Sequence, residues 1–293
     1  MVKVKMIIHG RSNVISKLQR MAKANSEDID VVLTENALHA QSLAETSDGY
    51  DLVISCGGDG TNNHIVNGLM TIASDRRPAL GFIPAGSGND FARIYSSGSL
   101  EEMLKRCANK SFHQLDLIKI ECNSIETHVL NMMTCGIGAE IANTVNERKF
   151  KMPATFNYYT AIIAWLAKYK APTLEIMFDD QKIKSDAFLA ALGNGSYAGN
   201  GLGLNPQSTI DDGLMGISII GNVGVIDFLK YQSTLKRCDY VKDPRVSYHK
   251  SAEVSIKVLN ESLPIETDGE FFARLNPGDR LVAKILPAAL TVV

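Results

Sequence analysis

The chain has 293 residues, of which 45% are hydrophobic and 21% charged, a composition that predicts a globular protein with a sizeable core. A formal net charge of −2 argues against whole-chain attraction to nucleic acid or anionic lipid, and five scattered cysteines argue against a disulfide framework or a zinc site. The N-terminal apolar run is too short for a signal peptide, and the best apolar window is far shorter than the roughly 20 residues of a spanning helix. We therefore expect a soluble, cytoplasmic protein with reduced thiols.

The first third of the chain alternates between strand-like and helix-like segments. Strands are predicted at 3–9, 29–33, 51–55 and 78–83, and helices at 14–24, 37–45, 63–72 and 100–107. Such alternation predicts βαβ units around a parallel sheet.

The pattern changes near Leu115. Strands are predicted at 115–122, 127–133, 174–178, 183–192, 214–220, 253–258, 263–266, 271–275 and 281–285, and helices at 141–150, 156–169 and 225–235. We therefore predict a nucleotide-binding α/β domain over 1–113 and a β-rich substrate domain over 114–286. Whether the tail 287–293 returns to the first domain is left open.

Two glycine-rich turns follow predicted parallel strands, the first at Gly57–Thr61 and the second at Gly86–Asp90. Ligands of open α/β sheets bind at this edge. We expect the glycines to adopt positive φ and to let backbone N–H groups approach a phosphate beside a helix start. One such turn is equally consistent with a tight turn in which Asp59 bonds its own backbone. Two turns on neighbouring strands favour phosphate, although neither a G-x-G-x-x-G nor a G-x-x-x-x-G-K-[ST] motif is present.

Four segments carry a resemblance to a known family. They are GGDGTNNHIVNGL (57–69), PAGSGNDFAR (84–93), LGNGSYAGNGLGLNPQSTIDDGLMGISI (192–219) and IETDGE (265–270). In this order they resemble the diacylglycerol kinase catalytic domain of the bacterial soluble lipid kinases, which is related to sphingosine, ceramide and, more distantly, NAD kinases. The resemblance implies a Rossmann-like nucleotide domain followed by a β-sandwich, with the active site in the cleft between them.

The resemblance also implies roles for individual residues. The residues implied to contact ATP are Thr34, Gly57, Gly58, Asp59, Gly60, Thr61, Gly86, Ser87, Asn89 and Asp90. A Mg²⁺ element is implied at 211–214, with the Asp212 carboxylate and the main-chain carbonyls of Thr209 and Leu214 as ligands.

A carboxylate must also receive the proton of the attacking hydroxyl. The resemblance implies Glu270 for this role, with Asp268 orienting it or sharing the proton. Asp59 remains a rival, either as the base or as a magnesium contact. Without the resemblance, Asp268-Gly269 would be an ordinary hairpin turn.

The chain departs from the family pattern at two places. It has His9-Gly-Arg-Ser-Asn13 where the family has an Asn-Pro-x-Ser-Gly-like loop, and it has His64 where a glutamate is usual. A neutral imidazole cannot replace a carboxylate near Mg²⁺, so these departures bear on nucleotide affinity and on the level of activity.

Three further segments were weighed. The aromatic and lysine-rich segment 156–170 either contacts a bilayer or packs on the β-rich domain with its lysines in solvent, and we favour packing. The basic run 148–151 is read as a solvated face that would help at an anionic membrane. The glycine-rich segment 193–203 is predicted to form a wall of the substrate site.

The leading hypothesis is an ATP- and Mg²⁺-dependent kinase that phosphorylates a hydroxyl of diacylglycerol or a related lipid at the membrane surface. A peripheral contact with the inner face of the membrane and a homodimer are left open, and no nucleic-acid partner is expected. The alternatives are a kinase of a soluble substrate such as NAD, and a nucleotide- or lipid-binding protein with little catalysis.

Overall fold

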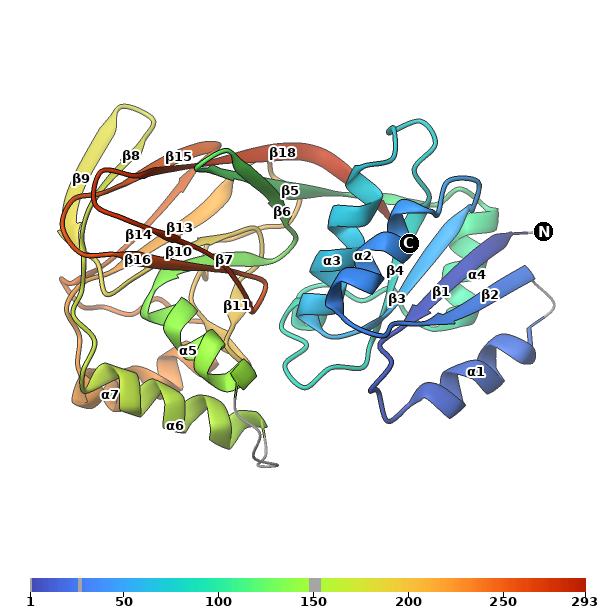
Figure 1. The fold of residues 1–293 in the computed structure, drawn as a ribbon, viewed down its shortest axis with the longest axis horizontal. Helices are drawn as coiled ribbons and strands as arrows, with labels where there is room; N and C mark the ends of the chain where they lie inside the picture. Colours follow the sequence, from blue (N-terminus) through green and yellow to red (C-terminus); the bar gives the residue numbers. More distant parts are fainter. Residues whose placement is uncertain (1, 26–27, 148–153) are drawn as a thin grey trace. The chain divides into compact units, whose positions relative to one another are not determined.

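The computed structural model describes residues 2–25, 28–147 and 154–293, and the chain divides into two compact units (Figure 1). The first unit contains Met1–Asp116 and Pro287–Val293, and the second contains Leu117–Leu286. An α/β unit is followed by an antiparallel β-sandwich, so the predicted fold class is confirmed. Within the described ranges, no helix is long and apolar enough to cross a membrane.

The first unit is built on a parallel sheet. Its strands run in the order β2 (Asp28–Leu33), β1 (Lys3–Ile8), β3 (Leu52–Gly57) and β4 (Ala79–Pro84). The last strand of the chain, β18 (Arg280–Val292), adds its end to this sheet, where Val292 pairs in parallel with Leu80. Every residue of β3 is buried, as expected of a central parallel strand covered on both faces.

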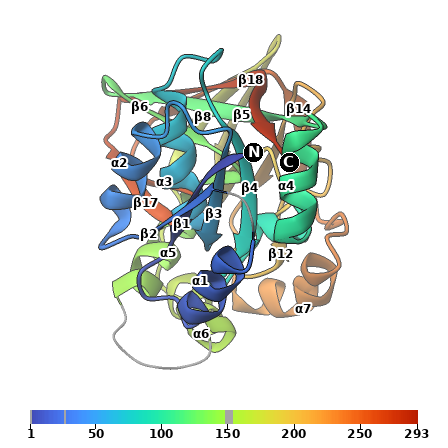
Figure 2. The same ribbon diagram turned by 90° about the vertical axis from the view of Figure 1, so that its right-hand side faces the viewer.

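Four helices accompany this sheet. Helices α1 (Ile15–Lys23) and α4 (Leu100–Ala108) share one apolar core with β1 and β3 (Figure 2). Helices α2 (Ala37–Glu45) and α3 (Asp59–Met70) pack against each other, and a short 3₁₀ turn, η1 (Phe91–Arg93), follows β4. This layering leaves the C-terminal ends of the parallel strands as the edge at which the glycine turns lie.

The second unit is a sandwich of two sheets. One sheet is antiparallel throughout, in the order β14 (Val246–Ser251), β13 (Met215–Ile220), β10 (Leu189–Gly193), β7 (Met132–Gly136), β16 (Leu263–Thr267) and β17 (Glu270–Leu275). The other contains β5 (His113–Cys122), β6 (Ile125–Val129), β15 (Glu253–Val258), β8 (Thr173–Phe178), β9 (Gln181–Asp186) and the first part of β18. Alternate residues such as Leu174, Ile176 and Phe178 fill the core between the sheets.

Three helices lie on the outer face of the six-stranded sheet, namely α5 (Ile137–Glu147), α6 (Ala154–Leu166) and α7 (Val225–Lys236). A small hairpin of β11 (Tyr197–Ala198) and β12 (Leu202–Gly203) packs with these helices on the same face of the sheet. Residues of these elements form a second apolar core with that face of the sheet. The helical part of segment 156–170 therefore packs on the β-rich unit, as we predicted.

Several predicted elements have different bounds in the structure. The single strand predicted at 183–192 is two strands, β9 and β10, which belong to different sheets. The strand predicted at 127–133 is likewise divided between β6 and β7, and β14 was missed. Both predicted strands were too long, because a continuous apolar run does not show at which residue the chain passes from one sheet to the other. The basic run 148–151 lies outside the described residues.

Candidate functional site

The first glycine turn is shorter than the sequence suggested, because α3 begins at Asp59 and not at Asn63. Gly58 is the N-cap of α3, with φ −100° and ψ −172°, and no side chain caps this helix end. None of Gly57, Gly58 and Gly60 has a positive φ, so that expectation was wrong. The chain passes from β3 into α3 without a residue in the left-handed region. The first N–H groups of α3 have no side-chain cap, so this helix end suits an anion.

Close approach of main chain explains the glycines instead. A Cβ on Gly86 would overlap the Cα of Gly58, and a Cβ on Gly57 would overlap the side chain of Thr61. The two glycine turns therefore lie in direct contact, with no room for a side chain between them. This brings the N–H groups of both turns to one place on the edge of the sheet.

Asp59 fastens the second turn to the start of α3. Its Oδ2 accepts a hydrogen bond from the Asp90 N–H at 3.0 Å, and its Oδ1 accepts one from the Phe91 N–H at 3.0 Å. The negative charge beside a predicted phosphate site is thus met by main-chain donors of the neighbouring turn. The alternative was that Asp59 accepts hydrogen bonds from its own turn. These two hydrogen bonds instead come from the second turn and from the residue that follows it.

The second turn is closed by its own asparagine. The Oδ1 of Asn89 accepts a hydrogen bond from the Gly86 N–H at 3.0 Å, and its Nδ2 donates to the Gly86 carbonyl at 2.9 Å. Asp90 is buried and forms an ion pair with Arg93 at 3.3 Å. Ser87 is exposed at the tip of the turn, where its hydroxyl and main-chain N–H remain accessible to a ligand.

Thr34 lies at the end of β2, two strands away from the glycine turns. Its Oγ1 accepts a hydrogen bond from the Gly10 N–H at 3.1 Å, which ties the unusual His9–Asn13 loop to β2. The ten residues assigned to ATP therefore lie at or just after the C-terminal ends of β2, β3 and β4. His64, on α3, is partly buried, and burial lowers its pKa, so the imidazole is neutral at pH 7.

Asp268 and Gly269 form the turn between β16 and β17. Their φ values are 50° and 87°, as in the two-residue turn that D-G favours in hairpins. A hairpin turn alone would leave Asp268 in solvent, but here it is buried. Its carboxylate accepts hydrogen bonds from the N–H groups of Leu130, Asn131 and Met132, each at 2.9 Å. Asp268 thus holds the hairpin against the segment that enters β7.

Glu270 follows this turn as the first residue of β17 and is exposed. Partial desolvation of its carboxyl raises the pKa of Glu270 above the ordinary value for a glutamate. A raised pKa brings a carboxylate closer to the working range of a general base.

Asp212, the side chain implied to bind Mg²⁺, already has partners in the structure, and its role as a ligand together with the carbonyls of Thr209 and Leu214 stays a prediction. The Asp212 Oδ1 accepts a hydrogen bond from the Leu214 N–H at 3.1 Å, and its Oδ2 forms an ion pair with Lys250 Nζ at 2.5 Å. Both carboxylate oxygens thus have partners, and one of these is a cation. Across the part of the chain that the structure describes, no group of three or more His, Cys, Asp or Glu side chains is arranged to hold a metal.

A cavity of about 140 Å³ lies in the second unit, between the outer face of the six-stranded sheet and the three helices. Apolar side chains make most of its wall, among them Ile141, Ile162, Phe188 and Phe228. Ala198, Gly199 and Leu202 also line it, so the predicted substrate-site segment 193–203 contributes to this wall. Such a lining suits an aliphatic chain.

Two polar residues of the cavity wall, Glu266 and Thr134, were missed by the sequence reasoning. Glu266 lies within the IETDGE motif, one residue before the strand ends at Thr267. An acid between Ile265 and Thr267 in a buried strand is the signal that could have identified it.

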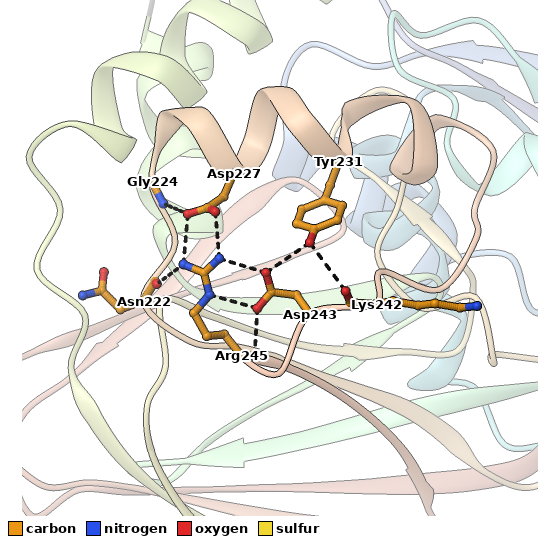
Figure 3. Close-up of polar contacts among 7 residues, drawn as sticks. All are labelled: Asn222, Gly224, Asp227, Tyr231, Lys242, Asp243 and Arg245. Carbon is orange, nitrogen blue, oxygen red and sulfur yellow. Dashed lines mark hydrogen bonds and ion pairs between the residues drawn. The ribbon is translucent and has the colours of Figure 1, made fainter.

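Helix α7 is attached to the loop before β14 by an arginine (Figure 3). Arg245 donates to both carboxylate oxygens of Asp227, at 2.7 and 3.0 Å, and to both oxygens of Asp243, at 2.8 and 2.9 Å. Tyr231 donates to Asp243 at 3.2 Å. Because Asp227, Tyr231 and Asp243 all line the cavity, this network, hereafter the Arg245 clasp, holds one wall of it in place.

Comparison with known proteins gives concordant results for both units. Residues 9–120 match the diacylglycerol kinase catalytic domain, and residues 131–293 match the YegS C-terminal NAD kinase beta sandwich-like domain. The chain belongs to this lipid kinase family. It is 27% identical to a diacylglycerol kinase of Bacillus subtilis (strain 168), over 92% of this chain and 87% of the relative.

A second relative and a solved structure are also similar to this chain over most of its length. A probable lipid kinase YegS-like protein of Chromohalobacter salexigens is 31% identical, over 78% of this chain and 75% of its own. The crystal structure of a putative diacylglycerol kinase from Bacillus anthracis str. Sterne superposes with a TM-score of 0.75 at 23% identity, covering 99% of this chain and 96% of that one. The resemblance inferred from the four motifs is thus confirmed for the lipid kinase family over the whole chain.

Proposed function

We propose that this kinase transfers the γ-phosphoryl group of ATP to a hydroxyl of a lipid such as diacylglycerol or a related lipid alcohol. The observation that carries the proposal is the hairpin of β16 and β17. Its Glu266 lines an apolar cavity, and four residues later it presents the candidate base Glu270. One rigid element thus joins a site for an aliphatic chain to a group that can accept a hydroxyl proton.

The chemistry divides between the two units. The N–H groups of the two glycine turns bind the phosphates of ATP, since they lie together at an uncapped helix start. Glu270 accepts the proton of the lipid hydroxyl, the resulting oxygen attacks the γ-phosphorus, and the bond to the β-phosphate oxygen breaks to release ADP. Mg²⁺ would enter with ATP to neutralise its charge, and no residue of this chain is assigned as its ligand.

The lipid acceptor requires contact with a membrane, and we propose that α6 and α7 provide it at the cytoplasmic face. Ile226 and Leu229 on α7 are 83% and 55% exposed, and Phe156 on α6 is 51% exposed. The helices touch each other through Tyr159 and Phe228. Three lysines lie over aromatic rings of this region: Lys168 over Trp165, Lys230 over Tyr231 and Lys236 over Tyr159. This combination suits an anionic bilayer. Replacing Ile226 and Leu229 with serine should reduce co-sedimentation with anionic vesicles, and unchanged sedimentation would refute the contact.

A kinase that phosphorylates NAD would have a related fold, but the residues of the candidate site support this function less well. NAD is polar throughout, whereas the cavity next to the Asp268-Gly269-Glu270 hairpin is lined mainly by apolar side chains. A binding protein with little catalysis would bind ATP analogues without phosphorylating any lipid, and the same assay distinguishes it.

The test is phosphorylation of a dispersed lipid panel, and of NAD, with labelled ATP and Mg²⁺. Glu270→Gln should lower the rate by about 10²–10⁴-fold, as expected for loss of a general base. The matched control is Glu261→Gln, which changes an exposed glutamate outside the site and should leave the rate unchanged. Lipid phosphorylation at the wild-type rate in a protein carrying both Glu270→Gln and Asp59→Asn would overturn the assignment.

A further inference from the structure

Glu266 is a buried acid in the wall of an apolar cavity. It lies directly opposite Thr134 in the pairing of β16 with β7, and both side chains line the cavity. Its Oε1 accepts a hydrogen bond from the Thr134 hydroxyl at 2.7 Å, and its Oε2 accepts one from the Gly269 N–H at 2.7 Å. The residue is only 5% exposed, so its carboxyl is held in a fixed position.

The surroundings of Glu266 are acidic. The pKa of Glu266 is raised to about 8, chiefly by burial; its hydrogen bonds with Thr134 and Gly269 oppose this rise, and the charges of Asp268 and Glu270 add to it. Among the described residues, the groups that shift this pKa include no cation. The titratable and charged groups around it and around the cavity are Asp268, Glu270, Cys135, the Glu140–Arg274 ion pair, Tyr158, Tyr231, Tyr248, and Asp227 and Asp243 with their partner Arg245.

The buried carboxyl of Glu266 lowers the stability of the ligand-free protein, but it can help to bind a cationic ligand. Burying an unpaired carboxylate costs several kcal/mol, so the group is kept neutral instead. Its role in tying the hairpin uses the Gly269 N–H, which an amide side chain could also bond. What only a carboxyl adds is the ability to become an anion when a ligand brings a cation into the cavity.

We propose that Glu266, with Thr134, binds the ammonium group of a long-chain amino alcohol whose aliphatic tail fills the cavity. This inference rests on the proposed function for the fate of the hydroxyl, which would be presented to Glu270 on the same hairpin. It makes Glu266 a specificity-determining residue that favours amine-bearing lipid acceptors over uncharged diacylglycerols.

Binding of such an amine displaces the proton of Glu266, and this gives a specific signature. Between about pH 6 and 7.5 the carboxyl is protonated and the amine is charged, so each complex releases one proton. The affinity should therefore rise about tenfold per pH unit in this range and level off near pH 8. A residue that only supports the hairpin would not link binding to a proton.

The experiment is calorimetry without ATP, using a medium-chain 2-amino-1-alkanol and the 1,2-alkanediol of the same length, both below micelle-forming concentrations. We expect the amine to bind at least about tenfold more tightly than the diol, because a desolvated ion pair adds roughly 1.4 kcal/mol or more. Glu266→Gln should remove this preference and the pH dependence, and Glu261→Gln should change neither. Should Glu266→Gln fail to fold, the dependence of the wild-type binding enthalpy on the ionisation enthalpy of the buffer reports the same proton.

Equal affinity for the two probes, or an amine affinity that does not vary with pH, would overturn the inference. The outcome for the proposed function is separate. Amine binding without phosphorylation of any lipid in the panel would leave this site standing and refute the kinase, whereas phosphorylation of diacylglycerol and amino alcohol at equal rates would support the kinase and overturn the preference for amines.

Discussion

Asp59 and Asp268 lie in different units but act in the same way, since each carboxylate accepts main-chain N–H groups from a distant segment. Asp59 holds the turn that contains Asp90, and Asp268 holds the strand entry at Leu130–Met132. Both were candidates for the catalytic base. Their hydrogen bonds use both carboxylates to hold segments of the fold together. The base that we propose is therefore Glu270, which is exposed beside the turn of its hairpin.

Asp268→Asn should therefore destabilise the protein. An asparagine retains one oxygen, but its amide group brings N–H donors to a place already filled by main-chain N–H groups. We expect the free energy of unfolding to fall by about 2–3 kcal/mol, because buried donors lose a charged acceptor. Urea unfolding measures the change. Asp180→Asn, at an exposed turn residue, is the control, and an equal loss in both variants would contradict the structural role.

The sequence predicted which residues form the turns, but not how they are held. Glycine and aspartate spacing identified Gly57–Thr61, Gly86–Asp90 and Asp268–Glu270 at strand ends. The partners of Asp268 lie more than 130 residues away, and local pattern carries no information at that distance. Glu266 escaped notice for the same reason, because a cavity is made by elements that only the fold brings together.

At the scale of elements, contact between the two glycine turns depends on the absence of a side chain at Gly86. Gly86→Ala would place a methyl group against Gly58 and push the turns apart. We expect the affinity for ATP to fall at least about tenfold, since 1.4 kcal/mol of lost binding suffices for that factor. Gly224→Ala is the matched control, because a Cβ there has space. Binding of a non-hydrolysable ATP analogue by Gly86→Ala at the wild-type affinity would show that the turns need not touch.

Helix α7 should depend on the Arg245 clasp in a pH-dependent manner. Arg245 holds the pKa of Asp227 and of Asp243 below their ordinary values, chiefly through its hydrogen bonds. Because the folded-state pKa values are lowered, the stabilisation is fully present above about pH 4, the unfolded value for aspartate, and is lost as the pH falls below it.

Hydrogen exchange of residues 225–236 measures this effect directly. We expect lower protection of the α7 amides, relative to their intrinsic exchange rates, below about pH 4 in the wild type, and low protection already at pH 7 in Arg245→Met. Arg76→Met, which breaks an exposed ion pair with Asp48 in the other unit, should leave α7 unchanged. Slow exchange of α7 at pH 7 in Arg245→Met would show that apolar packing alone holds the helix.

At the scale of the whole molecule, the chain crosses between its units twice, in β5 and in β18. The division lies between Asp116 and Leu117 in the first crossing and between Leu286 and Pro287 in the second. Just inside the first unit, the Asp116 Oδ1 accepts a hydrogen bond from the Ala288 N–H at 2.8 Å, so the two crossings are tied together. The last residues thus belong to the first unit, although they follow the second unit in sequence.

Removal of residues 288–293 should consequently unfold the first unit and spare the second. Leu290, Val292 and Val293 are fully buried, and each contributes about 1.5–3 kcal/mol when taken out of water. The Val293 N–H donates to the Leu80 carbonyl, and the Val293 carbonyl accepts from the Tyr95 hydroxyl. Together these losses approach the whole stability of an ordinary domain, about 5–15 kcal/mol.

Limited proteolysis with mass spectrometry distinguishes the two units in the truncated protein. Cleavage should concentrate within the first unit, while the described residues 117–147 and 154–286 of the second remain protected by the separate core of the sandwich and still bind the amino alcohol. Thr291→Ala, which removes two exposed hydrogen bonds with Gln114, is the control and should be cleaved like the wild type. If the truncated protein retained ATP-analogue binding and resisted cleavage in the first unit, the C-terminal strand would be dispensable, because the four parallel strands would then fold without it.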